Sequence, residues 1–428
     1  DGNPYNTEYK VSIFNIKAAG VSGATDYATF SVVVRGFSDT DRKKSVKETY
    51  NNVNLDPASP NYIAKIICHQ NSFPDLTDAQ LAIIGVLEDR KAIQNEGCAN
   101  GVEQIRAFLY QLNEGDFNSK IVDLGNILPG ETLRDTHYAL KVVTESLLKK
   151  SIIPIIIGGG HDLCYAQYWA YENLDKKVDL LSFDAHFDLD ATVDEHQIPN
   201  SQSYLNSIIL HEPNFLFNFS NIGYQTYYTN QESIQLMDKM YFDIHRLGEF
   251  RNKIQESEPI IRNADLISVD ISAVKMADAP GNANAHPNGF YGEEMCQMMR
   301  YAGMSDKCSS IGFYEFNPKY DHRNQTAELI AQMIWCFVEG FYARKDDFPS
   351  SSKNDYIKYR ATFQDVQHEV IFLKSKKTDR WWMQIPYPNL ISKNERYLMV
   401  PCSYEDYVQA TNGEVPNRWW KNYQKLII

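Results

Sequence analysis

Paired cysteines are missing from this sequence. Its seven cysteines are odd in number, scattered along the chain, and form no Cys-x-x-Cys pair. Disulfide scaffolds need closely spaced, paired cysteines, whereas scattered cysteines are typical of thiols in a reducing compartment. We therefore expect free thiols and a cytoplasmic protein.

Basic runs and long apolar runs are missing too. The chain has 42 Lys and Arg residues against 55 Asp and Glu residues, which gives a net charge of −13. An acidic chain without a Lys/Arg-rich run is poorly suited to bind nucleic acid or an anionic membrane. No apolar run approaches the roughly 18 residues that a membrane span requires. These absences favour a small-molecule partner over a nucleic acid or a membrane.

Length and pattern predict one large domain with additions at both ends. The chain has 428 residues, of which 43% are hydrophobic, so it can bury one large core. Residues 1–67 contain β-type runs, and residues 73–345 alternate strand and helix signals. A linker-like stretch then leads into residues 353–428, which are rich in aromatic side chains. We expect a small N-terminal α+β segment, a main α/β domain and a C-terminal β-rich extension.

Metal-ligand side chains follow two of the most apolar runs. The run Ile152–Ile157 is followed by three glycines and His161, and the run Val178–Phe183 is followed by Asp-x-His-x-Asp. The polar members of that second motif are Asp184, His186 and Asp188. Unbroken apolar runs are typical of strands buried on both faces of a parallel sheet. Because ligands of such sheets bind outside the carboxyl ends of the strands, we expect these side chains to converge on one crevice.

Strand and helix signals alternate from residue 73 onward, which is the signature of a parallel sheet with crossover helices. A loop followed by an amphipathic helix is expected over Gly97–Tyr110, and helices are expected over Thr132–Lys149 and Cys164–Tyr171. About eight strands are expected in all. Besides the two runs above, the candidates are Ala82–Val86, Ser119–Leu124, Phe219–Tyr224, Lys239–Ile244, Ala264–Val269 and Ser309–Tyr314.

Two of the later runs also end in acidic residues, Asp270 and Glu315. Four strand ends therefore supply imidazoles and carboxylates. This mixture favours Mn-like divalent ions over zinc sites built from thiolates. Each acidic residue has an alternative role, since Asp270 could cap the next helix and Glu315 could be a structural ion-pair partner.

Five motifs occur in an order that resembles the ureohydrolases, the family of arginase, agmatinase and formimidoylglutamase. They are Gly159–His161, Asp184–Asp188, Ser268–Asp270, Ala279–Gly281 and Glu315–Pro318. The resemblance covers about residues 73–345. It implies a three-layer α/β/α sandwich around a mostly parallel eight-stranded sheet. It also implies hydrolysis of a C–N bond in a linear amidine, guanidino or formimino group, with formimidoylglutamase as the nearest branch.

The resemblance implies one or two Mn²⁺ ions per chain as the cofactor. One ion would be held by His161, Asp188 and one oxygen each of Asp184 and Asp270. The second would be held by His186 together with the two shared carboxylates. Two such ions lower the pKa of bound water, which makes it a nucleophile at neutral pH.

Asp188 and Glu315 are the catalytic residues that the resemblance implies. Glu315 would also bind the substrate by pairing with its cationic nitrogen. The loop position where the family often has a proton-handling His corresponds to Asn200, which we expect to bind substrate. His196 and His211 are alternative candidates for the missing His. A small amidine or guanidino substrate is expected, and the protein is expected to be a homo-oligomer.

Two departures from the family pattern weaken the second metal site. Ser272 stands where the family has another Asp, so a neutral hydroxyl replaces a carboxylate ligand. Lys275 stands where the family has a further Asp, which puts a positive charge nearby. We predict that Lys275 could act as a built-in cation by forming a salt bridge to Asp270 or Asp184.

Two functions from different classes follow. The first is a metal-dependent hydrolase with an impaired second metal site. The second is a ureohydrolase-fold protein with reduced catalysis that serves as a binding or structural component, which Ser272 and Lys275 favour. Three other acidic residues are expected at loops or helix starts rather than as ligands. They are Asp162, Asp190 and Glu293.

The two end segments carry separate signals. Tyr27–Arg35 and Leu55–Ile66 resemble a stretch of contractile-tail sheath proteins, and the segment contains no expected catalytic residue. In the C-terminal segment, Arg380–Trp382 and Arg418–Trp420 repeat the sequence Arg-Trp-Trp. So much tryptophan needs burial, so we expect it to pack on the main domain or on a partner subunit. The alternative is a docking surface for another protein.

Overall fold

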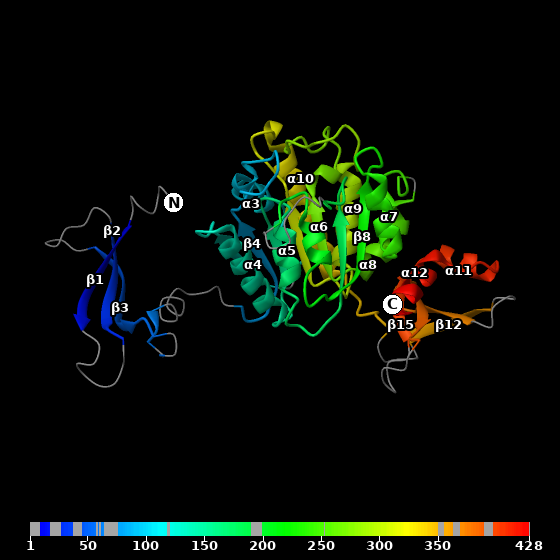
Figure 1. Ribbon diagram of the computed structural model, residues 1–428, viewed down its shortest axis with the longest axis horizontal. Helices are drawn as coiled ribbons and strands as arrows, with labels where there is room; N and C mark the ends of the chain where they lie inside the picture. The colour runs from blue at the N-terminus through cyan, green and yellow to red at the C-terminus, as the bar shows by residue number, and fades with distance from the viewer. Residues whose placement is uncertain are drawn as a thin grey trace. The chain divides into compact units, whose positions relative to one another are not determined.

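The computed structural model in Figure 1 divides the chain into two compact units, Asp1–Thr77 and Asp78–Ile428. It describes residues 9–17, 27–36, 45–56, 59, 61–63, 76–117, 120–189, 199–251, 253–349, 355–362, 369–388 and 397–427. The division into segments 1–67, 73–345 and 353–428 stays a prediction. In the part of the chain that is described, no helix has the length and apolar character needed to cross a bilayer.

The first unit contains an antiparallel sheet of three strands in the order β1-β2-β3. Its strands are β1 (Tyr9–Lys17), β2 (Thr29–Gly36) and β3 (Val46–Asn54). The first two pair with each other and fit the β-type runs expected in residues 1–67. The third was missed because its sequence is mostly polar, and only two of its apolar side chains, Tyr50 and Val53, join the buried cluster with Val32. The likeness to sheath proteins stays a prediction.

The second unit is built on an eight-stranded sheet in which every pairing is parallel. The strand order is β5-β4-β6-β11-β10-β7-β8-β9. The strands are β4 (Ala79–Val86), β5 (Lys120–Ile127), β6 (Ile153–Ile157), β7 (Val178–Phe183), β8 (Leu216–Tyr224), β9 (Asp243–Arg246), β10 (Leu266–Asp270) and β11 (Ser310–Tyr314). The α/β fold class and the strand number expected from the sequence are therefore confirmed.

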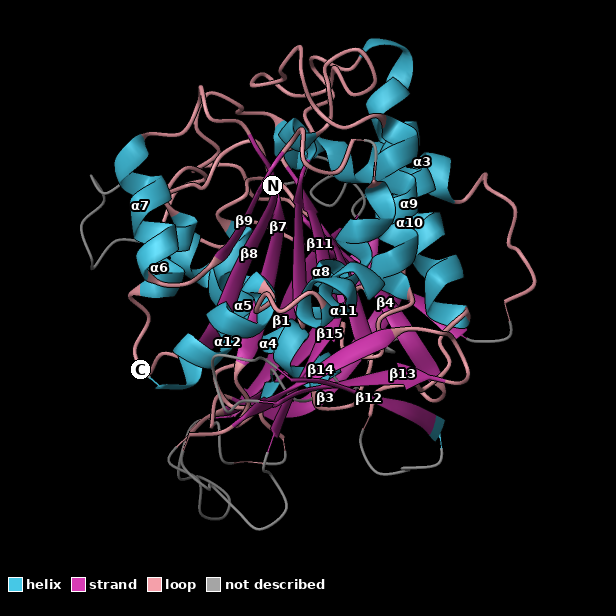
Figure 2. Ribbon diagram, turned by 90° about the vertical axis from the view of Figure 1, so that its right-hand side faces the viewer, coloured by secondary structure: helices cyan, strands magenta, loops and turns pink. Residues whose placement is uncertain are grey.

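Helices cover both faces of this sheet, as Figure 2 shows, with α3, α9 and α10 on one side and α5, α6 and α7 on the other. The helices of the main domain are α3 (Val102–Leu109), α4 (Leu133–Leu148), α5 (Leu163–Trp169), α6 (Tyr204–Ile209), α7 (Gln231–Lys239), α8 (Glu258–Asn263), α9 (Gly292–Gly303) and α10 (Gln325–Tyr342). The expected helix over Thr132–Lys149 is confirmed. Thr132 starts it through a capping box with Asp135.

One expected strand was placed too early. The sequence suggested Lys239–Ile244, but α7 runs to Lys239 and β9 begins only at Asp243. Between them Tyr241 adopts a left-handed backbone with φ of 56°, which breaks the helix before the strand can start. The apolar residues that suggested a strand are the end of an amphipathic helix and its turn.

The C-terminal segment forms an antiparallel sheet in the order β12-β13-β14-β15 with two helices. These elements are β12 (Tyr356–Thr362), β13 (Glu369–Ser375), β14 (Trp381–Pro386), β15 (Tyr397–Cys402), α11 (Tyr404–Thr411) and α12 (Asn417–Ile427). The first two strands pair antiparallel, which fits the β-rich extension expected from the sequence. The first Arg-Trp-Trp repeat enters β14, whereas the second lies in α12.

Three of the four tryptophans of the two repeats are buried, and Trp381 and Trp419 pack in the core of the extension itself. Trp381, Trp382 and Trp419 are buried, while Trp420 is 48% exposed. The guanidinium of Arg262, at the end of α8, lies 4.4 Å from the ring centre of Trp382 and so joins the extension to the main domain.

Truncating Trp382 should destabilise the second unit. Trp382→Ala removes a fully buried ring together with its contact to Arg262, and we expect a loss of about 3–5 kcal/mol in the free energy of unfolding. Trp420→Ala is the matched control, because its ring is about half exposed, and we expect little change. Chemical denaturation of both variants measures the difference. Equal small effects would show that the extension does not depend on this contact.

Candidate metal centre

His161 is brought to the carboxyl end of the sheet by a tight glycine turn after β6. The backbone N–H of Gly160 donates to the carbonyl of Glu88 at 3.0 Å. A Cβ atom at Gly159 would lie 1.8 Å from that same carbonyl oxygen, so no larger residue fits this turn. The three glycines thus act as a turn. They place His161 in the interior, where it is fully buried.

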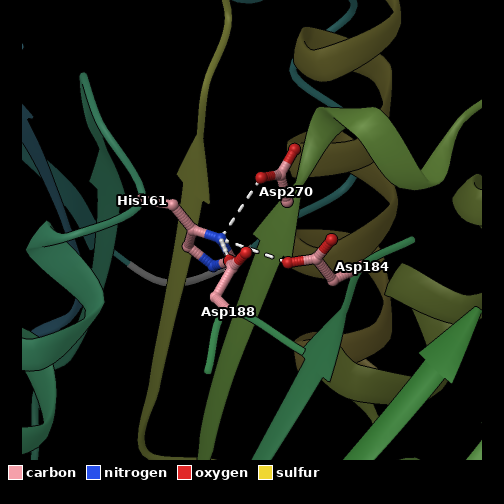
Figure 3. A group of neighbouring side chains, drawn as sticks. All are labelled: His161, Asp184, Asp188 and Asp270. Carbon is pink, nitrogen blue, oxygen red and sulfur yellow. Dashed lines mark hydrogen bonds and ion pairs between the residues drawn. The ribbon is translucent and has the colours of Figure 1, made fainter. Parts of the chain in front are cut away.

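Three carboxylates converge on one nitrogen of His161, as Figure 3 shows. The Nδ1 atom lies 3.1 Å from Asp188 Oδ2, 3.3 Å from Asp184 Oδ2 and 3.2 Å from Asp270 Oδ2. One potential ligand atom from each of the four residues lies within 4.8 Å of the others. Residues from three strand ends therefore meet at a point suited to a single ion.

The other ring nitrogen of His161 contacts a serine. His161 Nε2 lies 2.6 Å from Ser268 Oγ, which comes from the middle of β10. Such contacts behind a histidine ligand set its orientation and its tautomer. A serine in this position leaves Nδ1 to face the carboxylates.

The cluster carries more negative charge than the protein around it balances. Burial and the neighbouring Asp184 raise the pKa of Asp188 to about 8. Burial opposes a charged imidazole, yet Tyr204 and the three carboxylates hold the pKa of His161 well above its usual value. Asp184 Oδ2 is buried, and among the described residues it accepts no hydrogen bond and has only its ion pair with His161 Nδ1 at 3.3 Å. A divalent cation would satisfy this oxygen and balance the charge, so the residues fit the expected ion.

His186 lies beside this cluster. Its Nδ1 is 3.8 Å from Asp184 Oδ1, and its side chain is 35% exposed. Burial opposes its charged form, but the Asp184 carboxylate outweighs it and raises the pKa of His186 to about 9. Its ring stands 5.3 Å from the ring of Tyr228 and 5.2 Å from that of His286.

Glu315 is held directly next to His161. Its Oε1 accepts from the backbone N–H of His161 at 2.8 Å, and its Oε2 accepts from Asn95 Nδ2 at 2.6 Å. Burial and the nearby Asp270 raise the pKa of Glu315 to about 8. Glu315 and Asp188 both adopt left-handed backbone conformations, with φ of 66° and 52°. Strained non-glycine residues of this kind cluster at functional sites.

Asp270 has the expected capping role and also faces the cluster, while its role as a metal ligand stays a prediction. Its Oδ1 accepts from the backbone N–H of Ser272 at 2.6 Å and caps the short 3₁₀ helix Ile271–Ala273. Its Oδ2 is the oxygen that faces His161. Ser272 is buried, and its hydroxyl donates to Asp184 Oδ1 at 3.5 Å. Ser272, which stands where the family has another Asp ligand, therefore still borders the cluster.

The prediction that Lys275 is a built-in cation is wrong. Its ammonium lies 3.5 Å from the ring centre of Tyr291 and 3.4 Å from Asp278 Oδ1. Lys275 follows the 3₁₀ turn, and its backbone N–H donates to Phe290. That pairing leads the side chain toward the start of α9 and away from Asp270 and Asp184.

The remaining expected residues are placed as follows. Asn200 Oδ1 accepts from the backbone N–H of Gln202, so its amide shapes a turn at the edge of the site, and its substrate role stays a prediction. His211 bonds Tyr165 at 3.1 Å and lies outside the cavity lining. Asp162 pairs with the buried His137 at 2.8 Å, and Glu293 lies in the first turn of α9. Asp190 and His196 lie outside the described residues.

A cavity of about 750 Å³ opens over the cluster. His186, Asp188, Asp270, Ser272 and Glu315 line its floor, and Tyr228 and His286 stand on its wall.

Three residues at this site were not found from the sequence: Asn95, Tyr228 and His286. Each lies in a loop far from any metal-binding motif, and no spacing rule points to them.

Comparison with known proteins shows which family has both this fold and these motifs. Residues 79–339 match the Arginase family. The chain belongs to this family. The formimidoylglutamase of Staphylococcus haemolyticus is 26% identical over 272 residues, which cover 60% of this chain and 85% of that protein. As a member of the arginase family, the chain is a hydrolase that acts on C–N bonds.

Solved structures share the fold of the main domain. The formiminoglutamase of Trypanosoma cruzi, determined with Mn²⁺, aligns with a TM-score of 0.59 at 23% identity, covering 64% of this chain and 97% of that one. The agmatine ureohydrolase of Thermoplasma volcanium aligns with a TM-score of 0.54 at 21% identity, covering 62% and 92%.

Manganese should stabilise the folded protein through His161. An ion that binds only the folded state raises the free energy of unfolding by about 2.7 kcal/mol at a hundredfold excess over its Kd. We expect Mn²⁺ to raise the Tm of the wild type and to raise that of His161→Ala far less. His245→Ala is the control, because this histidine pairs with Glu249 and does not line the cavity. The same rise in all three proteins would mean that the ion binds elsewhere.

Proposed function

We propose that this arginase-family chain hydrolyses the C–N bond of a small linear amidine or guanidino compound at the His161 cluster, with Mn²⁺ as its cofactor. The observation that carries the proposal is the buried group of three carboxylates around one imidazole nitrogen, at the floor of a cavity of about 750 Å³. Three of the four donors are carboxylates, and oxygen ligands of this kind suit manganese. The family supplies the reaction class.

His161, Asp184, Asp188 and Asp270 would hold the first ion. The chemistry that such ions supply is Lewis acidity, which makes water a nucleophile at neutral pH. The chain's own task is to position the ion and the substrate. Ser268 sets the ring of His161, and the backbone N–H of Ser272 fixes one oxygen of Asp270.

Glu315 would orient the substrate. Each of its oxygens accepts one hydrogen bond and retains a second lone pair. A cationic amidine nitrogen placed there would favour the ionised carboxylate and form a charge-assisted hydrogen bond. Such a contact holds the central carbon in position for attack from the metal side. Asn95 supports this geometry through its hydrogen bond to Glu315 Oε2.

A second Mn²⁺ would be held less tightly. Asp184 and Asp270 are shared with the first ion, His186 lies within reach of Asp184, and Ser272 contributes only a hydroxyl. Manganese favours carboxylate oxygens, so a carboxylate fewer weakens this half of the site. The alternative function, a catalytically reduced binding or structural component, rests on the same departure.

The cavity also suggests the charge of the substrate tail. Among the described residues that line it, none is Lys or Arg, whereas four are carboxylates: Asp188, Asp270, Glu315 and Glu232. Residues 190–198, which lie outside the description, contain no Lys or Arg in their sequence. A tail with two carboxylates, as the name formimidoylglutamase implies for the relative, would lack a basic partner. A neutral or cationic tail fits better.

A matched substrate panel tests this function. The Mn²⁺-loaded protein would be given guanidino and formimino compounds with amine, uncharged and dicarboxylate tails, and the release of urea or ammonia would be measured. We expect the amine and uncharged tails to react and the dicarboxylate to react least. The fastest turnover with the dicarboxylate would contradict the charge argument. No turnover of any compound would favour the catalytically reduced alternative.

Glu315 should contribute mainly to turnover. Glu315→Gln keeps the shape but removes the charge that pairs with the amidine, so we expect kcat/KM to fall by about a hundredfold or more. Glu293→Gln is the control, because Glu293 is exposed at the start of α9. Equal kcat/KM values for the wild type and Glu315→Gln would remove Glu315 from the mechanism.

Returning the missing carboxylate should restore manganese binding. Ser272→Asp is expected to raise the Mn²⁺ content from about one ion per chain toward about two. Ser272→Asn is the control of the same size without the charge, and it should leave the content unchanged. Quantitative metal analysis after dialysis decides. Two tightly bound Mn²⁺ ions in the wild type would show that the second site is not impaired.

A further inference from the structure

We propose that His286 is a ligand of the second ion and replaces the carboxylate that is absent at Ser272, so that this half of the site prefers imidazole-binding ions such as Co²⁺ or Zn²⁺ to Mn²⁺. The inference rests on the proposed function, because it assumes that the first ion binds at the His161 cluster. It concerns a residue outside every motif that the sequence shares with the family.

The first observation is the position of the His286 ring. His286 lines the same cavity as His186, Asp270 and Ser272. The ring centres of His286 and His186 are 5.2 Å apart, with the planes inclined by 52°. Two imidazoles that bind one ion with metal–nitrogen distances of about 2.1 Å have ring centres about 5 Å apart. The spacing of this pair is therefore compatible with two ligands of one metal.

The second observation is a ring nitrogen of His286 that has no hydrogen-bond partner in the described part of the chain. His286 Nε2 is shielded from solvent and has no hydrogen-bond partner among the described residues. Buried polar atoms normally have a partner, and an exception calls for an explanation such as a bound ion. A cation in this part of the cavity would account for the unpaired His286 Nε2.

The ring of His286 is held in place by its own surroundings. Its carbonyl accepts from the backbone N–H of Met276 at 2.6 Å, and it forms a parallel β-bridge with Lys275. The ring stacks on Tyr228 with centres 4.2 Å apart and planes inclined by 27°. The segment of His286 is thus fastened to the segment that follows Ser272. His286 on the first segment can therefore take the place of the carboxylate ligand that is absent at Ser272.

The donor set then determines which ion binds. Two imidazoles, His186 and His286, join the shared carboxylates Asp184 and Asp270, and a hydroxyl stands where a third carboxylate would be. Imidazole suits zinc, copper, iron and nickel, whereas carboxylate, carbonyl and water suit manganese. Exchanging a carboxylate for an imidazole also lowers the negative charge that attracts a hard cation. The second site should therefore fill with Co²⁺ or Zn²⁺ at concentrations where Mn²⁺ leaves it largely empty.

Metal analysis of the full chain tests the inference without any activity assay. Wild type and His286→Ala would be stripped of metal, loaded with Co²⁺ or Mn²⁺, dialysed and analysed for bound metal, with the visible absorption of Co²⁺ as a second readout. We expect the Co²⁺ content to fall from about two ions per chain to about one in His286→Ala. The Co²⁺ spectrum should lose the contribution of one site. The Mn²⁺ content should stay near one in both proteins.

Two further variants separate ligation from folding. His245→Ala removes a histidine that does not line the cavity, and it should retain both Co²⁺ ions. His286→Ala combined with Ser272→Asp returns a carboxylate to the family position. We expect this double variant to recover a second ion, now with a preference for Mn²⁺. Recovery would show that His286→Ala is folded and lacks only a ligand.

The outcomes distinguish this inference from the proposed function. Two Co²⁺ ions in His286→Ala, or a single Co²⁺ ion in the wild type, would overturn the role of His286 and leave the first site standing. No bound ion of either kind in the wild type would overturn the proposed function itself.

Discussion

The structure depends on an unbalanced buried charge. Three carboxylates point at one imidazole nitrogen in the interior, all within 3.3 Å of it. Burial, together with repulsion from the nearby Asp184, raises the pKa of Asp188 to about 8. A cation between them turns the repulsion into attraction. The surrounding hydrogen bonds from Ser268 and Ser272 make sense as supports for a bound ion.

The sheet order brings these side chains together although they lie far apart in the sequence. The strands that precede them are neighbours in the order β6-β11-β10-β7, at the centre of the sheet. Each strand is mostly apolar and is buried along its whole length, between helices on both faces of the sheet. The packed strands beneath the site supply the stability. The polar residues can therefore adopt strained backbone conformations and hold like charges close together. The C-terminal extension adds a further sheet joined to α8 by Arg262 and Trp382.

Much of the core of this arrangement could be predicted from sequence, and the reasons for the failures are local. Runs such as Val178–Phe183 indicate buried parallel strands, and motifs at strand ends indicate a shared crevice. Side-chain directions in loops follow from pairings that no pattern records. Lys275 was expected beside the carboxylates, but the hydrogen bond of its backbone to Phe290 turns it toward Tyr291. His286 and Asn95 belong to loops without periodicity, so only the folded chain shows that they border the site.

The most direct test of the account is anomalous diffraction from crystals of the protein soaked in Mn²⁺. The account predicts a strong peak at the point where His161 Nδ1 and the carboxylates of Asp184, Asp188 and Asp270 meet. A well-ordered crystal without a peak at this point, or with manganese bound only elsewhere, would contradict it.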